Sequence, residues 1–254
     1  MNPPIRAAVF DWAGTTVDYG CLGPVAVIER VLAERGYSVP REEIRRDMGL
    51  KKIDHMSALC ARAGIAASLV PELYERFEAI QGEVILGASH VLPWIPAAVE
   101  ALRALGLRIG STTGYTRAML EPILRQARAE SYAPEASVTP DEAPAGRPFP
   151  WMLYLNAMRL GVYPMRAIVK VGDTPADMAE ARNAGCWAVG VTVGGNEVGL
   201  PESEWLALPA SDRESLRERA AARLRAAGAH LVLDTAADLP EALPLLARMN
   251  YEER

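Results

Sequence analysis

The stretch AVFDWAGTTVDYG, residues 8–20, contains an apolar run that ends at Asp11 and leads into a turn through Gly14. Such a run is typical of a buried strand, so Asp11 stands where a strand ends. An aspartate there is commonly a turn cap, but a carboxylate left accessible by small neighbours is also a candidate nucleophile. Two positions later, where a second acid would be its partner in proton transfer, the residue is Ala13. Chemistry at Asp11 must therefore find that proton transfer elsewhere or do without it.

Apolar segments rich in valine and isoleucine recur along the chain and alternate with helical patterns. The predicted strands cover residues 6–12, 107–113, 167–173, 187–193 and 230–235, and the predicted helices cover residues 116–129, 150–161, 175–184, 211–227 and 238–249. Short buried strands separated by helices predict an α/β fold with a doubly wound parallel sheet and a Rossmann-like core. Ligands bind beyond the carboxyl ends of such strands, which places Asp11 on the functional edge.

Residues 21–98 interrupt this alternation, because they contain helical patterns and no convincing strand. Helices are expected over residues 23–36, from Pro40, from near Lys51 to Gly64, and from Pro71. We therefore predict an all-helical cap domain, residues 21–98, inserted into a core domain of residues 1–20 and 99–254. A helical insert above the functional edge of a sheet is expected to act as a lid.

The composition is that of a folded, soluble protein, with half of the 254 residues hydrophobic and a net charge of -5. Without a basic block, neither nucleic acid nor an anionic membrane is an expected partner. No apolar run is long enough for a membrane span, and no signal peptide is evident. The three cysteines lack metal-ligand spacing, which favours reduced thiols and a cytoplasmic location. Residues 249–254 are expected to fray.

Four segments resemble the signature motifs of the haloacid dehalogenase superfamily: FDWAGTTVD (10–18), GSTTGYTR (110–117), GRPFPW (146–151) and VGDTPADM (171–178). With MGLKKIDH (48–55) in the insert, the chain resembles the phosphonatase family, the phosphonoacetaldehyde hydrolases. Each motif alone is weak, but five in this order around a helical insert are specific. The resemblance covers nearly the whole chain. It implies cleavage of the carbon-phosphorus bond of phosphonoacetaldehyde to acetaldehyde and phosphate, and a homodimer formed through the cap.

The core motifs supply a nucleophile and a metal site. Asp11 would attack phosphorus and form an aspartyl-phosphate. An oxygen-rich site suits Mg²⁺, so we assign Asp11, Asp173 and the main-chain oxygen of Ala13 as ligands. Asp177 is expected in the second shell, where it orients the site; its alternative role is in the capped start of a helix behind Thr174.

Two further core segments are expected to bind the substrate. Thr112 and Thr113 follow a predicted strand and precede a helix, where a hydroxyl and neighbouring amides can hold a phosphoryl oxygen or simply cap the helix. Arg147 lies in a proline-rich loop where relatives usually carry lysine. A forked cation there matches the oxygens of a phosphonate, although a loop arginine can also be merely solvated.

The insert decides the substrate. Met48, Lys52 and His55 are spaced to share a face if their segment is helical, and without further information that face would be packing with exposed lysines. The resemblance instead implies that Lys52 forms a Schiff base, with Lys51 facing solvent. Lys52 should then have a lowered pKa, and His55 would shuttle protons. By resemblance, Met48 and Cys21 line the closed pocket.

Two alternatives stay open beside this interpretation. One is a phosphate-ester hydrolase or phosphomutase that uses Asp11 without an imine, and the other is a non-catalytic protein that binds a phosphorylated metabolite. Ala13 and Lys52 argue against the first, and the pair of Asp11 and Asp173 argues against the second. The remaining cysteines and histidines are assigned structural roles: Cys60, Cys186, His90 and His230.

Overall fold

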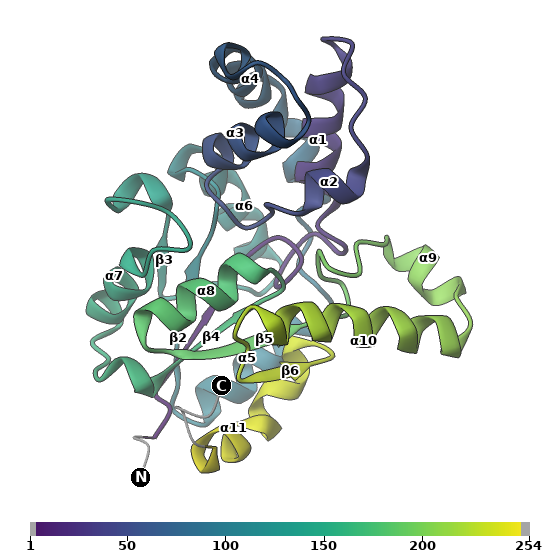
Figure 1. The fold of residues 1–254 in the computed structure, drawn as a ribbon. Helices are drawn as coiled ribbons and strands as arrows, with labels where there is room; N and C mark the ends of the chain where they lie inside the picture. Colours follow the sequence, from purple (N-terminus) through teal and green to yellow (C-terminus); the bar gives the residue numbers. More distant parts are fainter. Residues whose placement is uncertain (1–3, 250–254) are drawn as a thin grey trace.

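A computed structural model describes residues 4–249 of the chain (Figure 1). Residues 250–254, within the segment expected to fray, lie outside the described residues. The core is one six-stranded parallel sheet in the order β3-β2-β1-β4-β5-β6. Its strands are β1 (Ala7–Phe10), β2 (Arg108–Thr112), β3 (Ala136–Val138), β4 (Ile168–Gly172), β5 (Trp187–Val191) and β6 (Leu231–Leu233).

This order confirms the predicted doubly wound, Rossmann-like α/β fold. The chain order reverses between β1 and β4, which are hydrogen-bonded neighbours. In such sheets the crevice at the reversal is the usual ligand site. Strand β3 was not predicted, because three residues are too few to show a period.

Alternation along β1 divides the core between the two faces of the sheet. Ala7 and Val9 pack in one apolar cluster with α7 (Trp151–Leu160) and α8 (Pro175–Ala184). Ala8 and Phe10 pack in a second cluster on the opposite face. Successive strand residues point to opposite faces, so both faces of the sheet are buried. The helices contributing to the second face include α5 (Ile95–Ala104), α6 (Arg117–Ala129) and α11 (Leu239–Arg248).

Four helices form a group beyond the carboxyl ends of the strands, seen in purple and blue at the top of Figure 1. They are α1 (Leu22–Ala33), α2 (Arg41–Arg45), α3 (Lys52–Arg62) and α4 (Val70–Ala88). Helix α4 packs against both α1 and α3, and residues 21–88 contain no strand. We call this group the helical insert. The predicted domain boundary at 98/99 falls inside α5, and the division into two domains stays a prediction.

The helices of the core match the predicted segments to within a residue or two, including α10 (Ala210–Ala226). Two helices were not predicted, α5 and the short α9 (Glu202–Ala207). Across residues 4–249, none of the helices has both the length and the apolar character needed to cross a bilayer.

Candidate active site

Asp11 lies at the carboxyl end of β1, at the chain reversal of the sheet. Its amide donates to the Val171 carbonyl of β4 at 2.9 Å, which continues the pairing of the two strands. The chain then folds back at once, since the amides of Thr15, Thr16 and Val17 all donate to the Trp12 carbonyl. This tight turn leaves the Asp11 carboxylate at the edge of the sheet, with the residue only 5% exposed.

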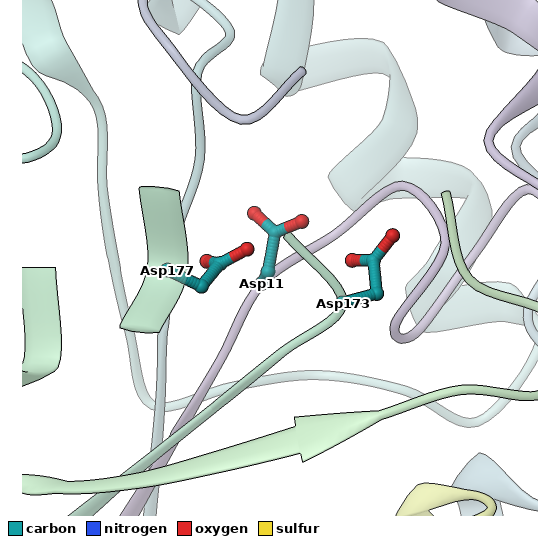
Figure 2. Close-up of side chains that lie close together, drawn as sticks. All are labelled: Asp11, Asp173 and Asp177. Atoms are coloured by element: carbon teal, nitrogen blue, oxygen red, sulfur yellow. The ribbon is translucent and has the colours of Figure 1, made fainter. Parts of the chain in front are cut away.

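Three carboxylates meet at this edge. Figure 2 shows Asp11 between Asp173, which follows β4, and Asp177, in the first turn of α8. One oxygen from each lies within 4.8 Å of the others. Burial raises the pKa of Asp173 well above its usual value, and repulsion from Asp11 and Asp177 adds to the effect. Asp173 therefore lies close to two other carboxylates, and its own hydrogen-bond donors are neutral and do not balance their charge.

The surroundings of Asp173 fit a cation. Its two oxygens accept hydrogen bonds from neutral donors, the Thr15 hydroxyl at 2.6 Å and the Asn196 amide at 2.7 Å. Hard divalent cations prefer such clusters of carboxylate oxygens, and a cation would relieve the repulsion with Asp11. Asp11 and Asp173 could thus hold a divalent metal ion between them.

Asp177 is already engaged by protein groups. Its Oδ1 pairs with Arg147 Nη1 at 3.1 Å and Lys170 Nζ at 2.9 Å, and its Oδ2 accepts from the Thr174 hydroxyl at 2.6 Å. Burial opposes ionisation, but these two cations hold the pKa of Asp177 below its usual value. This arrangement suits a residue that orients the site from behind the metal.

Arg147 is fully enclosed, which excludes the solvated loop position considered as its alternative. Its guanidinium donates to Asp11 Oδ1 at 2.7 Å and to Glu180 Oε2 at 2.9 Å, besides Asp177. Burial works against the charge, but the three carboxylates raise the pKa of Arg147 above its usual value. A fixed cation is thereby pointed at the Asp11 carboxylate, where it could offset the charge of a bound anion.

Sequence reasoning missed Lys170 and Glu180, which are both buried. Lys170 belongs to β4 and shares its α8-facing side with Ile168, so it meets the side chains of α8. Glu180 lies three residues after Asp177 on that helix and pairs with Arg147. A lysine inside an otherwise apolar strand was the available signal, because a buried charge requires a partner.

The two predicted threonines have different positions. The Thr112 hydroxyl accepts from Arg147 Nη2 at 2.8 Å and donates to Glu180 at 3.0 Å, so it lies behind the guanidinium. Thr113 lines the central cavity described below, and its hydroxyl accepts the Tyr115 amide at 3.1 Å. Of the two, Thr113 is the one placed to touch a ligand.

Lys52 is the first residue of α3 and is 5% exposed. Helix α3 begins at Lys52, as predicted to within a residue, and Met48 lies in the turn before it, so the condition for a shared helical face is not met at Met48. The two side chains meet nevertheless, with Lys52 Nζ 3.4 Å from the Met48 sulfur. Lys52 Nζ also lies 5.4 Å from the centre of the Tyr115 ring, a residue the sequence reasoning missed. Burial lowers the pKa of Lys52, whereas its neighbour Lys51 is half-buried rather than solvent-facing.

His55 lies one turn beyond Lys52 and is completely buried. Its Nε2 is 2.7 Å from the Ile44 carbonyl, and its Nδ1 has no hydrogen-bond partner. Burial, with repulsion from Lys52, lowers the pKa of His55 to about 3. It is therefore a neutral imidazole at physiological pH and stands behind the lysine, not on the wall of the cavity.

One small cavity joins the two parts of the site. Its volume is about 20 Å³, and it is lined by Asp11, Ala13, Cys21, Pro24, Met48, Gly49, Lys52, Thr113, Gly114, Tyr115, Arg147 and Thr174. The insert and the core touch here backbone to backbone. A Cβ on Gly114 would come within 2.3 Å of the Leu50 carbonyl oxygen, and one on Gly49, at φ +91°, within 2.4 Å of the Thr174 hydroxyl. Both glycines are required by this close approach.

Comparisons with known proteins agree with this geometry. Residues 5–185 match the haloacid dehalogenase-like hydrolase family. The phosphonoacetaldehyde hydrolase of Bacillus cytotoxicus is 44% identical over 97% of this chain and 98% of its own, and that of Bacillus cereus is 43% identical over 92% and 94%.

A solved structure is also similar along nearly the whole chain. The crystal structure of a phosphonoacetaldehyde hydrolase like protein from Oleispira antarctica matches with a TM-score of 0.93 and 34% identity, covering 97% of this chain and 94% of that chain. Identity at this level along the entire chain shows common family membership. The chain therefore belongs to the haloacid dehalogenase-like hydrolases and, among them, to the phosphonoacetaldehyde hydrolase family.

Proposed function

We propose that the protein hydrolyses the carbon-phosphorus bond of phosphonoacetaldehyde and releases acetaldehyde and phosphate. One observation carries the proposal: Lys52 and Asp11 line the same cavity, which has alanine at position 13. Two nucleophiles facing one small space suit a substrate with two electrophilic centres, an aldehyde and a phosphonate. The names of the curated relatives support this substrate.

The first half of the reaction belongs to Lys52. Its neutral amine adds to the aldehyde carbon, and loss of water leaves a protonated imine. Burial favours the neutral amine because it lowers the pKa of Lys52. The sulfur of Met48 and the ring of Tyr115 lie next to the nitrogen, and burial outweighs the attraction of Asp11 and Asp18, which favours the protonated amine. His55, neutral and behind the lysine, is proposed to relay protons during these steps.

The second half belongs to Asp11. Its carboxylate attacks phosphorus while Arg147 and Thr113 hold the phosphonate oxygens. The carbon-phosphorus electron pair moves into the protonated imine, so the carbon leaves as an enamine. Protonation at carbon regenerates the imine. Water then hydrolyses the imine to acetaldehyde and the aspartyl-phosphate to phosphate, which restores Lys52 and Asp11.

A divalent cation is part of the proposal, and we assign Mg²⁺. Asp11, Asp173 and the main-chain oxygen of Ala13 would hold it, and when bound it would offset negative charge on the phosphonate and the nucleophile. Asp177 would stay behind it, oriented by Lys170 and Thr174.

The test is direct. Purified protein incubated with phosphonoacetaldehyde and Mg²⁺ should release acetaldehyde and phosphate in equal amounts. Phosphate without matching acetaldehyde would point to a different chemistry on this substrate. Release of neither product would favour the ester hydrolase, phosphomutase or binding-protein alternatives, because phosphonoacetaldehyde contains no phosphate ester.

The proposal includes a cellular location, a partner and an oligomeric state. All three cysteines are buried and free, which supports a reducing, cytoplasmic location. The partner is a small phosphonate, with no role for nucleic acid or membrane. A homodimer remains the expectation from the family resemblance, and light scattering after size-exclusion chromatography measures it.

A further inference from the structure

Arg45 at the end of α2 connects the helical insert with two core segments. Its Nη1 donates to the Gly20 carbonyl at 2.9 Å and to Asn196 Oδ1 at 3.1 Å, and its Nη2 donates to the Gly199 carbonyl at 3.0 Å. Asn196 returns a bond from Nδ2 to the Arg45 carbonyl at 3.2 Å. One half-buried side chain thus fixes the start of the insert and the loop after β5 to each other.

The loop after β5 also donates a hydrogen bond to Asp173, a proposed metal ligand that follows β4. The amide of Asn196, whose residue is 2% exposed, donates to Asp173 Oδ2 at 2.7 Å. The same asparagine therefore contacts Arg45 through its side chain and Asp173 through its backbone. Displacing Arg45 would remove a constraint on the loop and, through it, on the Asp173 carboxylate.

In the other direction along the chain, Arg45 is followed by the turn that carries Met48 and Gly49 and then by Lys52. The Gly49 carbonyl accepts from Arg147 Nη1 at 3.3 Å. This turn is thus attached to the core at both ends, by Arg45 before it and by Gly49 at the cavity. The position of Lys52 depends on these attachments.

We infer that Arg45 is a positioning residue that aligns the Lys52 segment of the insert with the Asp173 loop of the core. It touches neither the substrate nor the reacting atoms. The inference rests on the proposed function only for what the alignment achieves, since the contacts themselves are independent of the reaction. Arg46 is the matched control, because it is the next residue, exposed, and paired only locally with Glu43 at 3.2 Å.

The experiment compares Arg45→Ala, Arg45→Lys and Arg46→Ala with the parent protein. Hydrogen exchange without substrate should be about tenfold faster in Arg45→Ala for peptides covering residues 46–52 and 194–199, and unchanged in Arg46→Ala. Mg²⁺ affinity, measured by calorimetry, should fall about tenfold through Asn196 and Asp173. Unchanged exchange in both peptides would overturn the inference.

Kinetics give a second readout. Arg45→Ala should lower kcat about tenfold to a hundredfold with a smaller change in KM, because alignment is lost and not substrate contact. Added guanidinium should restore part of kcat in Arg45→Ala and none elsewhere, whereas a loss from unfolding would not be rescued. Arg45→Lys should keep a fraction of the activity, since it restores one contact but not the fork.

The two proposals fail separately. If the parent does not cleave phosphonoacetaldehyde, the proposed function fails, while faster exchange and weaker Mg²⁺ binding in Arg45→Ala still support the alignment. If the parent cleaves it and Arg45→Ala matches the parent in kcat, exchange and Mg²⁺ affinity, the positioning role is wrong.

Discussion

The core and the insert each place a buried cation at the cavity, and the pKa values of the two cations shift in opposite directions. On the core wall, Arg147 lies among buried carboxylates, with Lys170 behind it, and the pKa of Arg147 is raised because those carboxylates outweigh its burial. On the insert wall, Lys52 is also buried, its Nζ lies 3.4 Å from the Met48 sulfur, and burial lowers its pKa despite the opposing attraction of Asp11 and Asp18. Burial alone therefore does not decide the charge of a cation. Direct ion pairs with carboxylates offset burial at Arg147, whereas at Lys52 burial prevails, so the two cations of one cavity have pKa shifts of opposite direction.

The largest loss of activity is expected when the amine of Lys52 is replaced by a permanent cation. Lys52→Arg should lose turnover by on the order of a thousandfold or more, because guanidinium cannot be deprotonated to form an imine. Borohydride added with phosphonoacetaldehyde should inactivate the parent and add mass to Lys52, but leave this variant unlabelled. Lys51→Arg is the control and should behave as the parent; labelling on Lys51 alone would contradict the assignment.

The core side of the site loses a proposed metal ligand if Asp173 is replaced. Asp173→Ala should lose about a hundredfold or more of Mg²⁺-dependent activity, because a proposed ligand is gone. The same change relieves repulsion within the carboxylate cluster, so the Tm measured by calorimetry should not fall by more than a few degrees. Excess chelator should inactivate the parent. Full activity in chelator would refute the metal role.

A carboxylate can also be added to the cavity next to Lys52. Ala13 lines the cavity, so Ala13→Asp places a carboxylate where it can pair with Lys52, raise the pKa of the amine and keep it protonated. Cleavage of phosphonoacetaldehyde should fall about a hundredfold, and weak phosphate-ester hydrolysis should appear, because an acid at this position can protonate an alkoxide. Ala13→Asn, of equal size and uncharged, is the control. Equal activity of Ala13→Asp and the parent would show that the alanine is incidental.

The smallest expected effect is a shift in the pH dependence of kcat/KM when a charge is placed next to Lys52. The amine of Lys52 reacts only when neutral, so kcat/KM should rise with pH through the pKa of Lys52, which is lower than that of a free lysine. Met48→Glu should raise that pKa and shift the rising limb to higher pH by about one unit, a loss of about tenfold at the acidic end. Met48→Gln should leave the limb in place. A limb that does not respond to Met48→Glu would belong to another group.

The sequence revealed those parts of the site that follow apolar strands. Asp11 and Asp173 were identifiable because each ends a buried run, and the order of the sheet then brings β1 and β4 together. Partners supplied by distant elements were harder to foresee. Nothing in the sequence singles out Glu180, because its partners Arg147 and Lys170 come from a loop and a strand distant from α8 in sequence.

The errors have local causes. The spacing of Met48 to Lys52 would fit a helical turn only if the helix began before Met48, but it begins at Lys52, after Gly49 with its φ of +91°. Strand β3 lacked the length for a periodic signal. Tyr115 was hidden in a turn, where no period marks a buried side chain, although its ring faces Lys52.

The contact between Gly49 and Gly114 limits how this enzyme could acquire new substrates. A side chain on Gly114 would meet the main chain of Leu50 and Gly49, and one on Gly49 would meet the Thr174 hydroxyl, so a larger residue at either position would push the insert and the core apart before it reshaped the cavity. Variation in substrate choice must come from residues that line the cavity without bridging the two parts, such as Cys21 and Met48. A mutant library aimed at longer aldehydes should therefore keep both glycines fixed and vary those two positions together.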